Sequence, residues 1–230
     1  MTSLQENLQW VRQRITTQCA ASGRDPQSVE LLAVSKTFPL AVVLAAHEAG
    51  QKQFGENYIQ EGVEKITACR ALPGCSDMVW HCIGPIQSNK TRLVATHFDW
   101  VHTVDRLKTA QRLSEQRPPE MPPLQVCIQV NIDGGANKAG VAPADTLDLA
   151  RQVAALPRLR LRGLMTIPEP APDYAGALAV HQAAKDLWDL MRAAGLDMDT
   201  LSMGMSADLE AALAAGSTMV RVGSALFGSR

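Results

Sequence analysis

One lysine stands where a buried strand should end. Residues 31–35 are apolar or small on both alternating faces, which is typical of a strand covered on both sides. Lys36 follows directly, and Pro39 suits the first turn of a helix that comes next. The carboxyl ends of parallel strands gather the chemistry of α/β folds, and an amine shielded from water there can attack a carbonyl carbon. The alternative is an ordinary lysine whose stem packs on its neighbours.

A second group of chemically useful residues lies in the last quarter of the chain. Gly204 and Gly223 would let a ligand approach the backbone, and Ser206 and Ser224 place hydroxyls near expected helix N-termini, which bind anions. Each pair taken alone could be a turn with a capping serine. Two pairs, after the seventh and eighth strands of a barrel, favour a phosphate site because barrels often hold phosphate there.

Short apolar runs alternate with helical patterns between these two regions. The expected strands begin near Leu31, Gln53, Met78, Phe98, Leu124, Leu159, Thr200 and Thr218. The expected helices cover residues 40–49, 59–68, 86–95, 106–116, 144–156, 173–194 and 207–215, with an extra helix over 4–21.

This alternation predicts an α/β fold, a single (β/α)8 TIM barrel with an extra N-terminal helix, as one domain over residues 1–230. A doubly wound open sheet is the alternative, and the short connections favour closure. The proline-rich stretches at 118–123 and 168–172 are interpreted as barrel loops, because the alternation continues across both.

Composition excludes several classes of function. The formal net charge of −1 offers no basic surplus for nucleic acid, and no long apolar run could span a membrane. The five cysteines lack CxxC spacing, which indicates free thiols in a reducing cytoplasm. The five histidines show no metal-ligand spacing, so no metal site is expected.

Pyridoxal 5′-phosphate (PLP) would satisfy both chemical regions, because barrel closure makes the first and last strands neighbours. Lys36 would form an imine with it, and the phosphate would be held by Ser206, Gly223 and Ser224. Five stretches carry a family resemblance: residues 33–37 (AVSKT), 54–58 (FGENY), 80–90 (WHCIGPIQSNK), 163–165 (GLM) and 201–206 (LSMGMS). They resemble the YggS/PROSC family of PLP-binding proteins, which are associated with vitamin B6 (PLP) homeostasis.

The resemblance extends from about residue 5 to Arg230, and its HxIGxxQxNK run is specific. It implies a barrel like the N-terminal domain of bacterial alanine racemase, with Lys36 carrying PLP as a covalent aldimine. It also implies that Asn57 lies near the cofactor and that Arg221 faces the pyridine nitrogen. His81 would either line the pocket or serve as a hydrogen-bonded structural histidine.

One loop departs from the family pattern. Asn131, Lys138 and Gly140 match, but the paired glycines at 134–135 make the loop more permissive. A role for this loop in closing over the cofactor, or for Lys138 as a secondary amine, is therefore left open.

The sequence favours a cofactor-binding protein over an enzyme. A racemase of this kind needs a second acid/base from an additional domain, whereas the sequence ends at Arg230 and neither Tyr58 nor Tyr174 lies in a catalytic motif. Arg221 would leave the pyridine nitrogen unprotonated and weaken the electron sink. We expect PLP homeostasis without strong turnover and no catalytic residue, with PLP-dependent apo-enzymes as acceptors of the cofactor and a monomer or weak dimer.

Two alternatives remain from the sequence. One is a PLP-dependent amino-acid racemase of low activity. The other is a Schiff-base aldolase that acts on a sugar phosphate and uses Lys36 with the same phosphate site.

Overall fold

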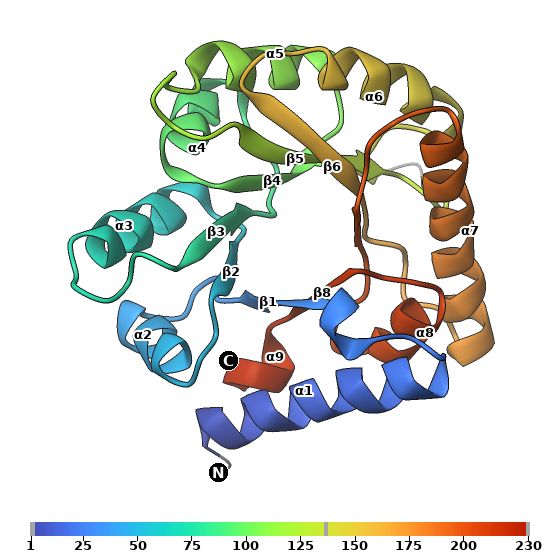
Figure 1. The fold of residues 1–230 in the computed structure, drawn as a ribbon, viewed down its shortest axis with the longest axis horizontal. Helices are drawn as coiled ribbons and strands as arrows, with labels where there is room; N and C mark the ends of the chain where they lie inside the picture. The colour runs from blue at the N-terminus through green and yellow to red at the C-terminus, as the bar shows by residue number, and fades with distance from the viewer. Residues whose placement is uncertain (1–2, 136–137, 229–230) are drawn as a thin grey trace.

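The strands of this chain close into a barrel (Figure 1). The computed structural model describes residues 3–135 and 138–228. Within them the parallel strands follow one another in chain order, and β8 pairs with β1 to close the ring. The strands are β1 (Glu30–Val34), β2 (Gln53–Glu56), β3 (Val79–Cys82), β4 (Trp100–Val104), β5 (Leu124–Val130), β6 (Leu159–Thr166), β7 (Thr200–Ser202) and β8 (Met219–Val222). The predicted (β/α)8 barrel is confirmed, and the open sheet is wrong.

Helices surround the barrel as an outer layer (Figure 1). They are α1 (Leu4–Ala21), α2 (Leu40–Glu48), α3 (Ile59–Arg70), α4 (Thr91–His97), α5 (Leu107–Gln116), α6 (Thr146–Ala154), α7 (Tyr174–Ala193), α8 (Leu209–Ala214) and α9 (Ser224–Phe227). The helix expected from residue 86 begins only at Thr91. Gln87 is extended, with φ −71° and ψ 145°, and a 3-10 turn over Ser88–Lys90 precedes the helix.

Two kinds of interior result from the alternation of side chains along each strand. Apolar side chains fill the layer between strands and helices, with Phe54, Ile66 and Leu164 fully buried. Inside the barrel, Leu32 packs with Ile83 and Met219, but buried polar residues lie beside them. The barrel interior is therefore partly polar, which is unusual for a packed core.

Helix α1 packs along the last part of the barrel, against α8 and α9 (Figure 1). A capping box at Ser3 and Glu6 begins it, and Leu8, Val11 and Ile15 form its buried face. Asn7 donates a hydrogen bond to the backbone carbonyl of Leu226, at 2.9 Å. The extra helix thus supports the segments that follow β7 and β8.

A membrane span, a metal site or a disulfide would each require particular features of the described residues. The helices formed by residues 3–135 and 138–228 are too short or too polar to span a bilayer. In the same residues, no His, Cys, Asp and Glu side chains are grouped as a metal ion would require. The cysteines Cys19, Cys69, Cys75, Cys82 and Cys127 are all buried as free thiols.

Candidate functional site

Lys36 lies just beyond the carboxyl end of β1 and lines a cavity at that mouth of the barrel. Successive strand residues point to opposite faces, so Ser35 is turned toward α3 and Lys36 toward the cavity. The cavity has a volume of about 590 Å³, which is sufficient for a small-molecule cofactor. The structure thus places the lysine where the strand pattern predicts it.

The cavity brings together residues from the two ends of the sequence. Of the residues proposed for binding, those that line it are Lys36, Asn57, Ser206, Arg221, Gly223 and Ser224. Apolar side chains that the sequence did not single out complete the wall: Phe38, Ile83 and Ile167. A lining that combines polar and apolar side chains would suit a flat ring that carries polar substituents.

Asn57 follows β2 and offers an acceptor that the folded chain leaves unused. Its Oδ1 atom is buried and accepts no hydrogen bond from the described residues. Gly84 packs directly against the backbone of Asn57, since a Cβ atom added at Gly84 would lie only 2.0 Å from the Asn57 backbone carbonyl oxygen. A glycine is therefore required in the HxIGP stretch. A buried acceptor without a protein partner is costly, so this atom is suited to accept from a bound ligand or from a water molecule.

Ser206 and Ser224 face one another across the segments that follow β7 and β8. Their hydroxyl oxygens are 3.4 Å apart. Asp208 holds the first segment, accepting from the Met205 N–H at 2.6 Å and contacting His181 Nε2 at 2.9 Å. Gly223 lies over β1, where an added Cβ would meet the Val34 carbonyl oxygen at 3.2 Å. The paired hydroxyls could donate to one anionic group.

Arg221 is buried in β8 and is one of the residues that line the cavity. Its Nη1 atom donates to Ser202 Oγ at 2.7 Å, and Nη2 donates to the Thr166 carbonyl at 2.8 Å. Both acceptors are uncharged. Burial lowers the pKa of Arg221 to about 10, so it stays protonated at neutral pH. A buried cation bonded to neutral groups favours an acceptor in the cavity.

A chain of hydrogen bonds leads from Arg221 through the barrel interior. Ser202 Oγ lies 3.0 Å from His102 Nδ1, and His102 Nε2 lies 2.8 Å from His81 Nδ1. His81 Nε2 lies 2.6 Å from Gln53 Oε1, toward the opposite mouth. Gln53 Oε1 can only accept, so His81 donates to it from Nε2. With both histidines neutral, each carries its proton on Nε2, and Ser202 donates to His102 Nδ1. We call these five residues the interior relay.

Both histidines of the interior relay are neutral. Burial lowers the pKa of His81 to about 3, and burial with the nearby His81 and Arg221 lowers the pKa of His102 well below its ordinary value. His81 is not among the residues that line the cavity. Its placement favours the hydrogen-bonded role rather than direct contact with a cofactor. Its link to the cavity runs through His102 and Ser202, two residues that the sequence did not single out.

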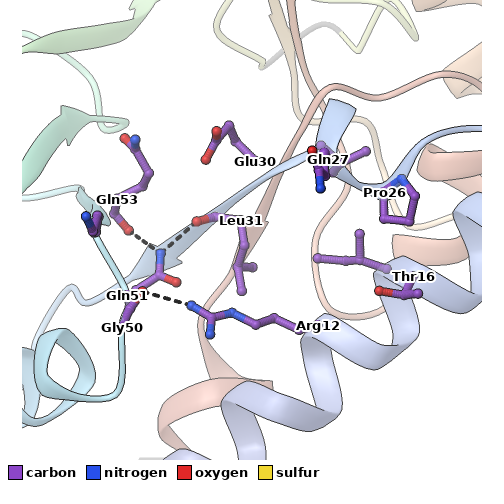
Figure 2. A pocket seen from close by; sticks show the side chains of 12 residues that line it. Arg12, Thr16, Pro26, Gln27, Glu30, Leu31, Gly50, Gln51 and Gln53 are labelled. Carbon is purple, nitrogen blue, oxygen red and sulfur yellow. Dashed lines mark hydrogen bonds between the residues drawn. The ribbon is translucent and has the colours of Figure 1, made fainter.

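Another cavity, of about 450 Å³, lies at the amino-terminal mouth beside α1 (Figure 2). Its polar groups serve the fold. Arg12 Nη2 donates to the Gly50 carbonyl at 3.0 Å, and Gln51 Nε2 donates to the carbonyls of Leu31 and Gln53 at 2.7 and 2.8 Å (Figure 2). These bonds join α1, β1 and β2, and none of them requires a ligand.

Lys138 lies close to the cavity but is engaged elsewhere. Its Nζ atom donates to the Ile167 carbonyl at 3.0 Å and lies 3.2 Å from carboxylate oxygens of both Asp133 and Glu169. Asn131 donates to the Gly135 carbonyl at 2.8 Å, which folds the loop on itself. The part of this loop at residues 136–137 lies outside the described residues. The described contacts favour a role for Lys138 in closing the loop.

Known proteins resemble the chain over its whole length. The family model "Alanine racemase, N-terminal domain" matches residues 1–230. A pyridoxal phosphate homeostasis protein of Pseudomonas aeruginosa is 56% identical, covering 100% of this chain and 97% of that protein. One from Escherichia coli K12 is 51% identical, covering 100% and 98%. The structure of PipY from Synechococcus elongatus with PLP bound is 36% identical, covers 98% of this chain and 100% of that one, and superposes with a TM-score of 0.84.

Proposed function

The chain belongs to the alanine racemase N-terminal domain family, with the pyridoxal phosphate homeostasis proteins as relatives, and on that basis we propose that it binds PLP in the cavity beside Lys36. In this proposal it serves intracellular vitamin B6 homeostasis and holds the cofactor through a Schiff base on Lys36. The observation that carries the proposal is that an amine, a buried guanidinium and two facing hydroxyls share one cavity.

The residues of the cavity fit the parts of this cofactor. Ser206, Ser224 and the backbone at Gly223 would hold the phosphate, and Arg221 would donate to the ring nitrogen. The unused Asn57 Oδ1 would accept from a polar group on the ring or from a water bound to it. PLP supplies an aldehyde that an amine can capture and a ring that withdraws electrons. Lys36 supplies the amine.

Arg221 supports a role without strong turnover. A guanidinium is a pure donor, so the ring nitrogen that faces it stays unprotonated and the ring is a weaker electron sink. The hydrogen-bond partners of Arg221, Ser202 Oγ and the Thr166 carbonyl, are uncharged, so they would not stabilise a protonated ring nitrogen as a carboxylate would. Such a site would bind the cofactor but support little catalytic turnover.

Absorption spectra and a racemisation assay together test this function. The purified protein should show the visible band of a PLP Schiff base, and the Lys36→Ala variant should lose it while a Lys185→Ala variant on α7 keeps it. The loaded protein should not racemise L-alanine at rates typical of enzymes, about 1–1000 per second. A colourless protein that takes up no PLP would contradict the proposal. Rapid racemisation lost with Lys36→Ala would assign the chain as a racemase instead.

We further propose that the protein acts in the cytoplasm and passes its cofactor to other proteins. The buried free thiols suit a reducing cytoplasm, and PLP-dependent apo-enzymes are the acceptors of the released cofactor. Transfer would be measured as activity regained by an apo-enzyme mixed with loaded protein in the presence of a trap for free PLP. If activity returns no faster than the cofactor dissociates, direct delivery does not occur.

A further inference from the structure

A buried charged cluster lies directly behind Lys36, on the outer side of β1. Lys65 of α3 donates to the carboxylate of Glu56 at 2.8 Å and to that of Glu61 at 2.7 Å. Glu56 is fully buried at the end of β2, and Lys65 is 6% exposed. Ser35 Oγ also donates to Glu56, at 2.6 Å. We refer to Glu56, Glu61 and Lys65 as the outer cluster.

The outer cluster binds both peptide groups that flank Lys36. Lys65 Nζ donates to the Ser35 carbonyl at 2.8 Å, which belongs to the peptide before Lys36. Glu61 Oε1 accepts from the Thr37 N–H at 2.6 Å, which belongs to the peptide after it. The cluster touches the backbone on one side while the Lys36 side chain lines the cavity on the other. It therefore holds the backbone on both sides of Lys36, from which the amine projects.

The backbone at this point is strained. The Phe38 N–H bonds to the Ser35 carbonyl at 3.1 Å and closes a turn that has Lys36 and Thr37 at its centre. Thr37 has a φ of +65°. Glycine is the usual residue in this turn position, and a β-branched residue there is unfavourable unless its surroundings enforce the conformation. The hydrogen bond to Glu61 is such an enforcement.

Placing this cluster in the protein interior is itself costly. Burial raises the pKa of Glu56, and its second oxygen, Oε2, is buried and has no partner among the described residues. Buried ion pairs contribute little to stability compared with apolar packing of the same volume. A cluster that costs free energy and also maintains a strained turn is better explained by what the turn carries than by stability.

We propose that Glu56, Glu61 and Lys65 are positioning residues that fix the turn around Lys36 and so aim its amine at the carbonyl of the cofactor. This rests on the proposed function of Lys36. The step is a condensation, in which the carbon–nitrogen double bond forms as the carbonyl oxygen leaves as water with both amine protons. The cluster takes no part in this chemistry. It raises the fraction of time that the amine spends in the geometry needed for attack. Small misplacements from that geometry have large effects on rate.

Glu61 gives the cleanest test because its side chain is partly exposed and Lys65 would keep Glu56 as partner after its removal. Apo-protein is mixed rapidly with PLP, and the rate of imine formation is followed by absorbance. In parallel, the dissociation constant of pyridoxine 5′-phosphate, which lacks the aldehyde, is measured by calorimetry. The matched control is Glu64→Ala, which removes an exposed carboxylate from the same helix.

In Glu61→Ala we expect imine formation about tenfold slower or worse, with the affinity for pyridoxine 5′-phosphate unchanged within about twofold. Glu61→Gln keeps the oxygen acceptor and should restore most of the rate, and Thr37→Gly should partly rescue Glu61→Ala, because glycine adopts a positive φ without enforcement. An unchanged rate in Glu61→Ala, or an equal loss of affinity for pyridoxine 5′-phosphate, overturns the inference. If the wild-type protein forms no imine, the proposed function fails instead.

Discussion

At the scale of single residues, the proposed binding mode divides two tasks between different side chains of the cavity. Ser206 and Ser224 would hold the anionic group, and Arg221 would donate to the ring nitrogen. The interior relay behind Arg221 fixes the position of the guanidinium through Ser202. Binding strength should therefore depend mainly on the serines, and the electronic state of the ring on Arg221.

A Ser206→Ala/Ser224→Ala double variant should retain PLP less well. Charge-assisted hydrogen bonds contribute roughly 1.5–3 kcal/mol each, so the dissociation constant should rise by at least about tenfold to a hundredfold. Equilibrium dialysis with PLP and with pyridoxal would measure it, and pyridoxal should bind far more weakly to the wild-type protein. Ser217→Ala, which removes a buried serine bonded to the Met203 carbonyl, is the control. Wild-type retention by the double variant would place the phosphate elsewhere.

The neutral His81 predicts a particular dependence of stability on pH. Burial lowers its pKa from 6.5 to about 3, so below pH 6.5 the unfolded chain takes up a proton that the folded chain does not. The contribution of neutral His81 to the free energy of unfolding should be complete above pH 6.5. It should decrease as the pH falls from 6.5 toward 3, by up to about 1.4 kcal/mol per pH unit.

Urea unfolding between about pH 7 and pH 5 would measure this slope before most carboxylates titrate. His81→Gln should reduce the slope, whereas His97→Gln, on the outer helix α4, should change it less. An equal slope in the wild-type protein and in His81→Gln would show that His81 is not held neutral.

At the scale of elements, α1 supports the segment that carries Ser206. Arg14 contacts Glu210 at 2.7 Å and donates to the Ser206 carbonyl at 3.3 Å. Arg12, on the same helix, binds instead at the opposite mouth of the barrel. The two arginines lie on the same helix but bond to opposite ends of the barrel. Substituting each in turn therefore gives a matched pair of variants.

Arg14→Ala should speed the release of PLP severalfold, because the Ser206 segment loses its outer support. Arg12→Ala should leave release unchanged, although both substitutions could lower the melting temperature slightly. Release would be followed as the absorbance change after loaded protein is mixed with excess apo-enzyme. Equal release rates in the two variants would show that α1 does not act on the cofactor site.

Elements close in sequence were predictable, and contacts across the barrel were not. Residues 31–35 revealed β1 because both faces of the strand are apolar, and Lys36 was found by its place at the strand end. The predicted start of α4 at residue 86 was wrong, because Gln87 takes an extended conformation that the helical periodicity does not encode. His102 was missed, since its pairing with His81 and Ser202 depends on barrel closure.

At the scale of the whole molecule, barrel closure brings β8 beside β1 and so sets Gly223 against Val34. The site exists only when the first and last strands are paired. We therefore propose that residues 1–230 form one folding domain, and that cofactor binding and barrel closure are linked.

Thermal unfolding followed by calorimetry and by the absorbance of the bound cofactor should give coincident single transitions. PLP should raise the midpoint, because a ligand that binds only the folded state stabilises it. Sedimentation of the same sample should show a monomer or weak dimer. A calorimetric transition that leaves the cofactor bound would show that part of the barrel unfolds independently.

Borohydride reduction tests most directly whether Lys36 carries the cofactor. Reduction of the loaded protein, followed by proteolysis and mass spectrometry, should find the pyridoxyl group on the peptide that contains Lys36. The phosphopyridoxyl label should be absent from Lys138, which is bonded to Asp133, Glu169 and the Ile167 carbonyl. A label found on Lys138 or Lys90 in place of Lys36 would contradict the account.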